Sequence, residues 1–268
     1  MLTNANGLDG TPQWISLSYS GGPPSKRIQS IPTYDAANNR MMIFGGCKNP
    51  SVPCFMLNDV WVLRNANGVG GTPQFTQLSP AGGSPAPRGA YGIGYDGVSN
   101  RLMVFGGGGN YPVNHLNDTW VLTNANGLGG APSWIQLSTA TIPPGPYGMS
   151  SAYDSTTNEL FVVGGVTAAG GATNDVWRLD NANGLGTPEW VQLFPNGGPP
   201  PEWDGLSWVS AYDPDNKRMM IFGGTISSAI SSTTSGSWSS ARRLTPRLLS
   251  SRRMSLPLRM PPAGTTRL

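Results

Sequence analysis

Few residues of this 268-residue chain have the types and spacing that enzyme chemistry requires. His115 is the only histidine, and no Gly-x-Ser-x-Gly motif is present to supply the nucleophile of a Ser-His-Asp triad around it. One imidazole is also too few for a metal site built on two histidines. The ordinary interpretation of His115, in the loop before Leu116, is a surface residue. We therefore expect a non-catalytic protein that holds no metal ion and no cofactor.

Three aspartates recur once per repeat, and this regularity indicates a structural role rather than a catalytic one. Each is the second residue of an Asn-Asp-x-Trp sequence, at Asp59, Asp118 and Asp175. An aspartate in a loop can accept hydrogen bonds from backbone N–H groups, so we predict that these carboxylates cap loops. The two cysteines, Cys47 and Cys54, lie in one loop, and the sequence alone leaves a local disulfide and two free thiols as equal alternatives.

These motifs belong to a repeat of roughly 59 residues. Each unit contains an apolar run that ends in a glycine pair, and the runs occupy residues 41–46, 102–107, 160–165 and 219–224. An uninterrupted apolar run predicts a strand that is buried on both faces, and the glycines can adopt φ values that side chains forbid. The recurring residues predicted to be structural are Gly45, Gly46, Asp59, Trp61, Gly106, Gly107, Asp118, Trp120, Gly164, Gly165, Asp175, Trp177, Gly223 and Gly224.

Each unit is expected to form four short strands. The first strand ends at a Tyr-Asp pair whose aspartate closes a tight turn on its own backbone, and the second strand is the apolar run. The third strand carries Asn-Asp-x-Trp, and an Asn-Ala-Asn-Gly sequence then forms a hairpin turn. That turn lacks the carboxylates of a calcium loop. The fourth strand begins with an aromatic residue, which is Trp14, Phe75, Trp134 or Trp190.

A four-stranded sheet of this size cannot bury both of its faces alone, so neighbouring sheets must cover one another. Arranged around an axis, such sheets form an all-β fold, a β-propeller with antiparallel blades, of which three are complete and a fourth is incomplete. Aromatic residues of strands two, three and four are expected to fill the spaces between blades. The loops after strand two and the crossings between units are then expected on the same face.

On these residues the chain resembles the kelch-repeat family, as found in bacterial kelch proteins and the central domain of galactose oxidase. The glycine pair, Asn-Asp-x-Trp and the aromatic residue of strand four all fit its pattern over residues 1–224. The units exceed the ~50 residues of a usual kelch repeat, and the ~40–45 residues of a WD40 repeat fit less well. Arg27 and Arg88 keep the arginine that starts a unit, whereas Pro146 and Gly205 replace it. Copper radical oxidases with such a propeller need two histidine ligands, which this chain cannot supply.

Residues 225–268 depart from the repeat. They contain seven arginines and no acidic residue. The rest of the chain has 10 basic and 14 acidic residues, so its net charge is −4, whereas that of the whole chain is +3. The Ser, Arg and Pro content of residues 225–268 predicts a disordered tail. An alternative hypothesis is a frameshifted translation of further repeats, because codons for Ser232–Trp238 can encode Leu-Asn-Asp-Leu-Trp-Val-Leu in another frame. The mildly acidic repeat region argues against nucleic-acid binding.

The variable loops are expected to carry the function. Their rings can stack on a sugar or hold a protein loop, and the candidate ligand-binding residues are Phe55, Tyr111, His115, Tyr147 and Trp203. The first hypothesis is a non-catalytic scaffold that binds a protein or a glycan. The second is the propeller part of a larger secreted, carbohydrate-active enzyme whose catalytic domain lies elsewhere. The third is a non-functional fragment.

The composition favours an extracytoplasmic bacterial parent protein. Charged residues make up only 12% of the chain, which is rich in Gly, Asn, Thr and Trp. The first residues lack the features of a signal peptide and match the end of a repeat, so the chain is expected to begin inside one. No apolar run reaches the roughly 18 residues of a transmembrane helix, so no membrane span is expected.

Overall fold

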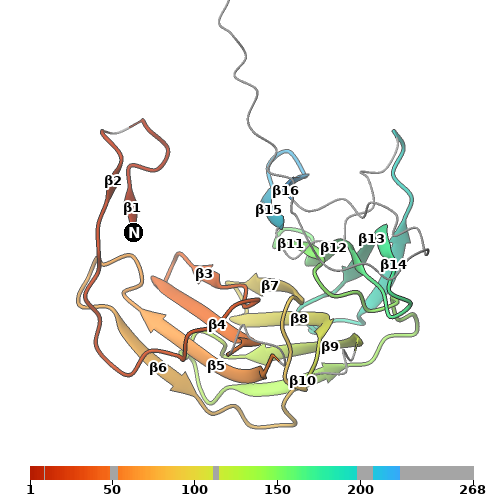
Figure 1. Ribbon diagram of the computed structural model, residues 1–268, viewed down its shortest axis with the longest axis horizontal. Helices are drawn as coiled ribbons and strands as arrows, with labels where there is room; N and C mark the ends of the chain where they lie inside the picture. Colours follow the sequence, from red (N-terminus) through yellow and green to blue (C-terminus); the bar gives the residue numbers. More distant parts are fainter. Residues whose placement is uncertain (9, 49–53, 111–114, 198–207, 224–268) are drawn as a thin grey trace, which may run out of the picture. The chain divides into compact units, whose positions relative to one another are not determined.

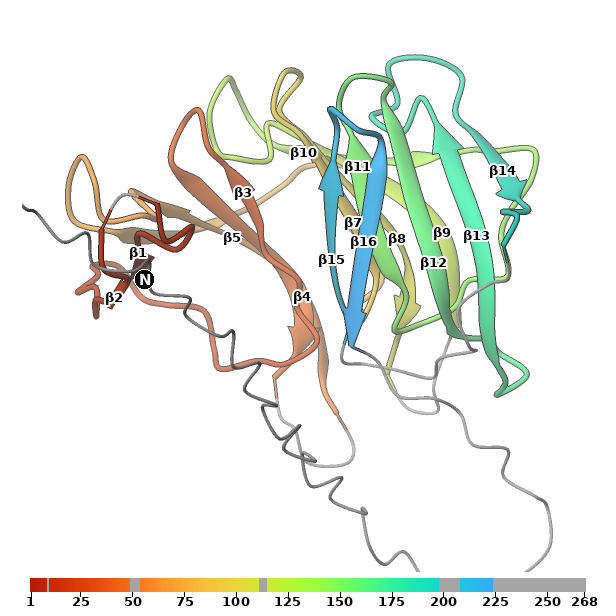
Figure 2. The same cartoon turned by 90° about the horizontal axis from the view of Figure 1, so that it is seen from above.

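The structure, a computed structural model, describes residues 1–8, 10–48, 54–110, 115–197 and 208–223. The chain divides into two units, Met1–Ala229 and Ile230–Leu268, and all described residues belong to the first unit. Every regular element in the described part is a β-strand (Figures 1 and 2), so none is a helix long and apolar enough to cross a bilayer. Gly224 and residues 225–268, with the predictions made for them, lie outside the described residues.

Three four-stranded antiparallel sheets follow one another along the chain, and we call them the first, second and third blades. The first blade consists of β3 (Thr33–Asp35), β4 (Arg40–Cys47), β5 (Met56–Arg64) and β6 (Gln74–Leu78). The second consists of β7 (Gly92–Asp96), β8 (Arg101–Gly108), β9 (His115–Thr123) and β10 (Ser133–Leu137). The third consists of β11 (Ser150–Asp154), β12 (Glu159–Val166), β13 (Ala172–Asp180) and β14 (Glu189–Leu193).

Two shorter sheets flank these blades within the described residues. One pairs β1 (Leu2–Thr3) with β2 (Gln13–Trp14), and the other pairs β15 (Trp208–Asp213) with β16 (Arg218–Gly223). The second of these pairs supplies the first two strands of a further unit. The predicted all-β fold with three complete four-stranded blades is therefore confirmed, and the described part of the fourth unit contains two strands.

The first strand of each blade contacts the first strand of the next. β3 contacts β7, β7 contacts β11, and β11 contacts β15, which Figure 2 shows in front of the third blade. Serine side chains join these strands, because Ser151 Oγ donates to the carbonyl oxygen of Ile93 at 3.0 Å and Ser210 Oγ donates to that of Ser151 at 2.7 Å. The inner strands thus follow one another around a common axis, as in a propeller.

The glycine pair of each of the three blades forms a bulge inside strand two. In the second blade the register shifts between Phe105 and Gly107, and φ is +62° at Gly106 and +97° at Gly107. A Cβ atom on Gly107 would lie 2.8 Å from the carbonyl oxygen of Gly89 in the preceding crossing. The positive φ values predicted for the glycines are confirmed. The glycines do not leave the sheet, however, because β8 continues to Gly108.

Apolar side chains of strands two and four fill the space between blades. The residues of β8 from Leu102 to Phe105 are fully buried, as predicted for a strand covered on both faces. The ring centroid of Trp134 in β10 lies 5.1 Å from that of Phe44 in the first blade. The ring centroid of Trp190 in β14 likewise lies 4.4 Å from that of Phe105 in the second blade. The second and third blades therefore each place the tryptophan of strand four against the second strand of the blade before it.

Hydrogen bonds also join the blades at the end where strands one and two turn. Asn126, in the Asn-Ala-Asn-Gly turn of the second blade, donates from Nδ2 to Asp35 Oδ2 of the first blade at 2.7 Å. The hydroxyl of Tyr95 donates to the same oxygen at 3.0 Å, and Asn183 repeats the contact with Asp96 at 2.9 Å. Asparagine at this turn therefore serves a contact between blades, beyond the hairpin role that the sequence indicated.

The third Tyr-Asp aspartate, Asp154, predicts that the stability of the protein depends on pH in acid. Asp154 accepts hydrogen bonds from Thr156 N at 2.8 Å, Thr156 Oγ1 at 2.6 Å and the Tyr212 hydroxyl at 2.7 Å. Burial raises the pKa of Asp154, but these hydrogen bonds outweigh burial and lower the pKa to about 2 from an ordinary value of 3.8. Because the folded-state pKa is depressed, the stabilisation is present above about pH 4 and is lost as the pH falls toward 2.

We therefore expect the free energy of unfolding to fall by about 2 kcal/mol between pH 4 and pH 2 through Asp154 alone. Urea titrations at pH 7, 4, 3 and 2 measure this change. Asp154→Asn should reduce the fall over that interval by about 2 kcal/mol, and the remaining fall belongs to other aspartates whose pKa is lowered, such as Asp35 and Asp96. Identical pH profiles for the two proteins would contradict the assignment.

Candidate functional site

The loops after strand two and the crossings between units lie at one end of the blades, and we call this end the loop face. Isolated bridges tie the two kinds of segment together, because Ile28 pairs with Cys47 and Tyr147 pairs with Val166. In each pair the first residue belongs to a crossing and the second lies at the end of a strand two. The loop face predicted from strand order is thus built on backbone hydrogen bonds.

The loop of the first blade presents an exposed aromatic ring on a fixed base. Cys47 and Cys54 are joined by a disulfide with a Cα–Cα distance of 5.8 Å, and Cys47 is fully buried. The next residue, Phe55, is 59% exposed, and its carbonyl oxygen accepts from Lys48 N at 3.0 Å. Asn110 of the second blade accepts from Met56 N at 2.9 Å, so the loops of neighbouring blades are connected.

His115 and Tyr147 form a second aromatic feature of the loop face. Their ring centroids are 5.2 Å apart and the ring planes meet at 54°. His115 is the first residue of β9 and is half buried, which differs from the predicted surface loop. Its Nδ1 atom is buried without a hydrogen-bond partner among the described residues. The structure therefore brings together two of the predicted ligand-binding residues. Tyr111 and Trp203, the remaining candidates besides Phe55, lie outside the described residues.

Beneath the loop face, two blades contain a buried cluster of arginine, aspartate and tryptophan, which we call the Arg–Asp–Trp cluster. In the second blade the Arg88 side chain is fully buried, and its Nη1 and Nη2 atoms donate to the Asp118 carboxylate at 2.7 and 2.9 Å. Trp120 Nε1 donates to the same carboxylate at 2.6 Å, and Arg88 Nη1 also donates to the carbonyl oxygen of Gly106 at 3.0 Å. The crossing is thereby held to strands two and three of its blade.

The first blade repeats this cluster. Arg27 donates to Asp59 at 2.6 and 2.9 Å, and Trp61 Nε1 donates to Asp59 Oδ2 at 2.7 Å. Burial by itself raises the pKa of the Asp59 and Asp118 carboxyls. Hydrogen bonds from the arginine and the indole outweigh burial, so the pKa of each carboxyl lies below its ordinary value. Both aspartates are therefore ionised, and the arginine of the same cluster balances the charge of each.

These contacts correct the predicted role of the motif aspartates in detail. They were expected to cap loops on backbone N–H groups, whereas the side chains of Asp59 and Asp118 bind a guanidinium and an indole. Trp61, Trp120 and Trp177 are only half buried. Trp120 and Trp177 nevertheless pack against the buried clusters between blades, as predicted for strand three. The signal for the arginine contact was present in the sequence, because Arg27 and Arg88 each lie eight residues before the Asp of the Tyr-Asp pair.

The inner strands border a further cavity of about 590 Å³. Tyr95, Tyr153 and Tyr212 line it, together with apolar and serine residues of the four inner strands. The hydroxyls of Tyr95 and Tyr212 are bound to Asp35 and Asp154. In the part of the chain that the structure describes, no three His, Cys, Asp or Glu residues group closely enough to hold a metal ion.

Sheets of this kind, with a glycine bulge in strand two and an Asp-x-Trp pair in strand three, define a β-propeller of kelch type. Residues 98–240 match the KLHDC2/KLHL20/DRC7 Kelch-repeats domain. The chain belongs to the kelch-repeat family. A solved structure titled "Structure of YjhT" is similar over 66% of this chain, with 16% sequence identity and a TM-score of 0.47. The chain covers 48% of that protein, and so spans about half its length.

Proposed function

We propose that this chain is a non-catalytic module that binds a protein ligand on its loop face. The observation that carries the proposal is the Phe55 ring, which is 59% exposed on a loop closed by the Cys47–Cys54 disulfide. An aromatic side chain on a rigid base can bury a large apolar area in a partner with little loss of conformational entropy. Most exposed loops lack such a support.

Two further observations support binding rather than catalysis. The carboxylates of Asp59 and Asp118 are taken up by arginine and tryptophan donors and have no free role as general acid or base. His115 packs against Tyr147 instead of facing a nucleophile in the described part of the chain. A protein ligand is favoured over a glycan because kelch-repeat domains of the family matched over residues 98–240 typically bind proteins.

Serine substitutions at Phe55 and Tyr147 test the proposal. Purified chain would be used to capture proteins, and the affinity of each captured protein would be measured directly by calorimetry. We expect Phe55→Ser and Tyr147→Ser each to weaken binding about tenfold or more, since aromatic anchors dominate interfaces. Val98→Ser is the matched control, because Val98 is 95% exposed but lies in the turn at the opposite end of the blade.

The outcomes separate the alternatives. Equal loss of binding in Val98→Ser would contradict a site on the loop face. Saturable binding to a glycan array that depends on Phe55 would replace the protein ligand with a sugar.

A further inference from the structure

The third blade lacks the arginine of the Arg–Asp–Trp cluster although its backbone is equivalent. The carbonyl oxygen of Arg88 accepts from Gly46 N of the first blade at 2.8 Å. The carbonyl oxygen of Pro146 accepts from Gly107 N of the second blade at 3.3 Å. Pro146 therefore occupies the place of Arg88 in the crossing, but its ring cannot reach the aspartate of strand three.

The partners of the missing arginine remain in place. Asp175 and Trp177 correspond to Asp118 and Trp120. Trp177 Nε1 is buried without a hydrogen-bond partner among the described residues, whereas the equivalent indole in each of the other blades donates to its aspartate. Within the same described part, the Asp175 carboxylate receives a single hydrogen bond of 3.3 Å, from Gln192 Nε2. The indole N–H is thus left without a partner beside a carboxylate that receives one long hydrogen bond.

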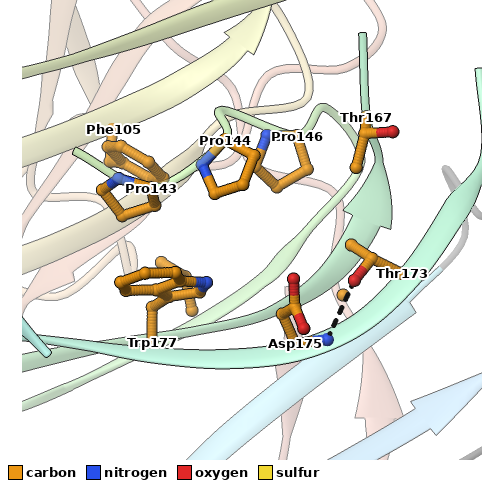
Figure 3. Close-up of a pocket in the computed structure, with 10 residues that line it drawn as sticks. Phe105, Pro143, Pro144, Pro146, Thr167, Thr173, Asp175 and Trp177 are labelled. Carbon is orange, nitrogen blue, oxygen red and sulfur yellow. Dashed lines mark hydrogen bonds between the residues drawn. The ribbon is translucent and has the colours of Figure 1, made fainter. Parts of the chain in front are cut away.

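A cavity occupies the position that the guanidinium fills in the other blades. Figure 3 shows Asp175 and Trp177 facing Pro143, Pro144 and Pro146 across it. Its enclosed part has room for about one water molecule, within about 270 Å³ of space that opens to solvent. Gly164 also lines the cavity, and the equivalent glycines of the other blades accept a hydrogen bond from arginine at 2.9 and 3.0 Å.

We propose that this cavity binds the guanidinium group of an arginine side chain supplied by a protein partner. The same chain places a guanidinium at the equivalent position in two other blades, so the acceptors of the third blade suit that group. A carboxylate receives the planar fork of a guanidinium through two hydrogen bonds, which the point charge of a lysine ammonium cannot reproduce. The prolines and the Trp177 indole give the cavity apolar walls, which favour a flat cation that can lie along a ring face.

The source of the arginine rests on the proposed function, but the cavity itself does not. A partner bound to the loop face can reach it, because Pro146 immediately precedes Tyr147 in the same crossing. Binding of a small guanidinium compound to the cavity requires no partner. Failure of the guanidinium site and failure of the loop-face proposal can therefore be distinguished.

The experiment uses the indole N–H signal of Trp177 in a ¹⁵N-labelled protein, assigned with Trp177→Phe. N-acetyl-arginine amide should shift this signal with saturation at millimolar concentrations. N-acetyl-lysine amide should bind several-fold more weakly, and the neutral isostere N-acetyl-citrulline amide should leave the signal unmoved. The indole signal of Trp120 is an internal control, because Arg88 already fills its cluster.

Two variants complete the test. Asp175→Asn should weaken binding about tenfold or more, since it removes the charge from the acceptor. Pro146→Arg should move the Trp177 signal without ligand and abolish its response to N-acetyl-arginine amide. The proposal is overturned if the arginine compound leaves Trp177 unmoved, which would indicate a cavity filled by water alone. It is also overturned if citrulline or Asp175→Asn gives the same shift.

Discussion

Arg88→Met should lower the free energy of unfolding by about 3–5 kcal/mol. The Arg88 side chain is fully buried, and its guanidinium binds both oxygens of Asp118 as well as the carbonyl oxygen of Gly106. Methionine fills much of the volume but leaves the carboxylate without its counter-charge in a largely dry site. The lower end of the range is expected, because the Asp118 side chain keeps 22% of its surface in water.

Urea denaturation followed by tryptophan fluorescence measures this effect. The double variant Arg88→Met/Asp118→Asn should recover part of the loss, because the buried charge is then removed together with its partner. Arg27→Met in the first blade is a matched comparison with a smaller expected effect, since Arg27 retains 7% exposure. A loss below 1 kcal/mol for Arg88→Met would show that the cluster contributes little.

Trp190→Ala should lower the free energy of unfolding by a similar amount, about 3–5 kcal/mol. Trp190 is 2% exposed, its ring lies 4.4 Å from that of Phe105 in the second blade, and its Nε1 donates to Thr119 Oγ1 at 3.2 Å. Alanine would leave a cavity between two blades and an unpaired hydroxyl. Trp134→Ala should behave alike, because Trp134 is 4% exposed against Phe44.

Trp14→Ala provides the matched control. Trp14 occupies the same place in its repeat but is 81% exposed, and no strand two of a preceding blade covers it within the described residues. Its replacement should change the free energy of unfolding by less than about 0.5 kcal/mol. Equal effects at Trp14 and Trp190 would mean that these rings stabilise their own hairpins rather than the contact between blades. The same urea titrations decide the question.

The three blades also show how one substitution changes the chemistry of a repeat. Arg27, Arg88 and Pro146 occupy equivalent backbone positions, yet the first two neutralise an aspartate and the third leaves one open beside a cavity. In the repeat pattern, Pro146 is simply a residue that differs from the usual arginine. Its physical consequence is a buried indole N–H without a partner beside a carboxylate that has lost its arginine, and such a site favours a ligand.

The sequence by itself determined the strands, their order and the repeat. The apolar runs, the glycine pairs and the turn residues act over a few neighbouring positions, so their pattern predicts each blade and its turns. It also predicted the positive φ values of the glycines and the burial of β8 on both faces. For the same reason the candidate loops could be assigned to one face, although the pairing of His115 with Tyr147 could not.

Only the tertiary structure decided which distant side chains meet. Asp118 binds an arginine 30 residues before it, and Asn126 binds Asp35 across 91 positions of the sequence. Such contacts depend on how neighbouring blades stack, which no local pattern encodes. The same holds for Trp14 and Trp190, which are alike in sequence but differ in burial because a preceding blade covers only one of them. Likewise, Pro146 becomes informative only once Asp175 and Trp177 are seen beside the space that it leaves.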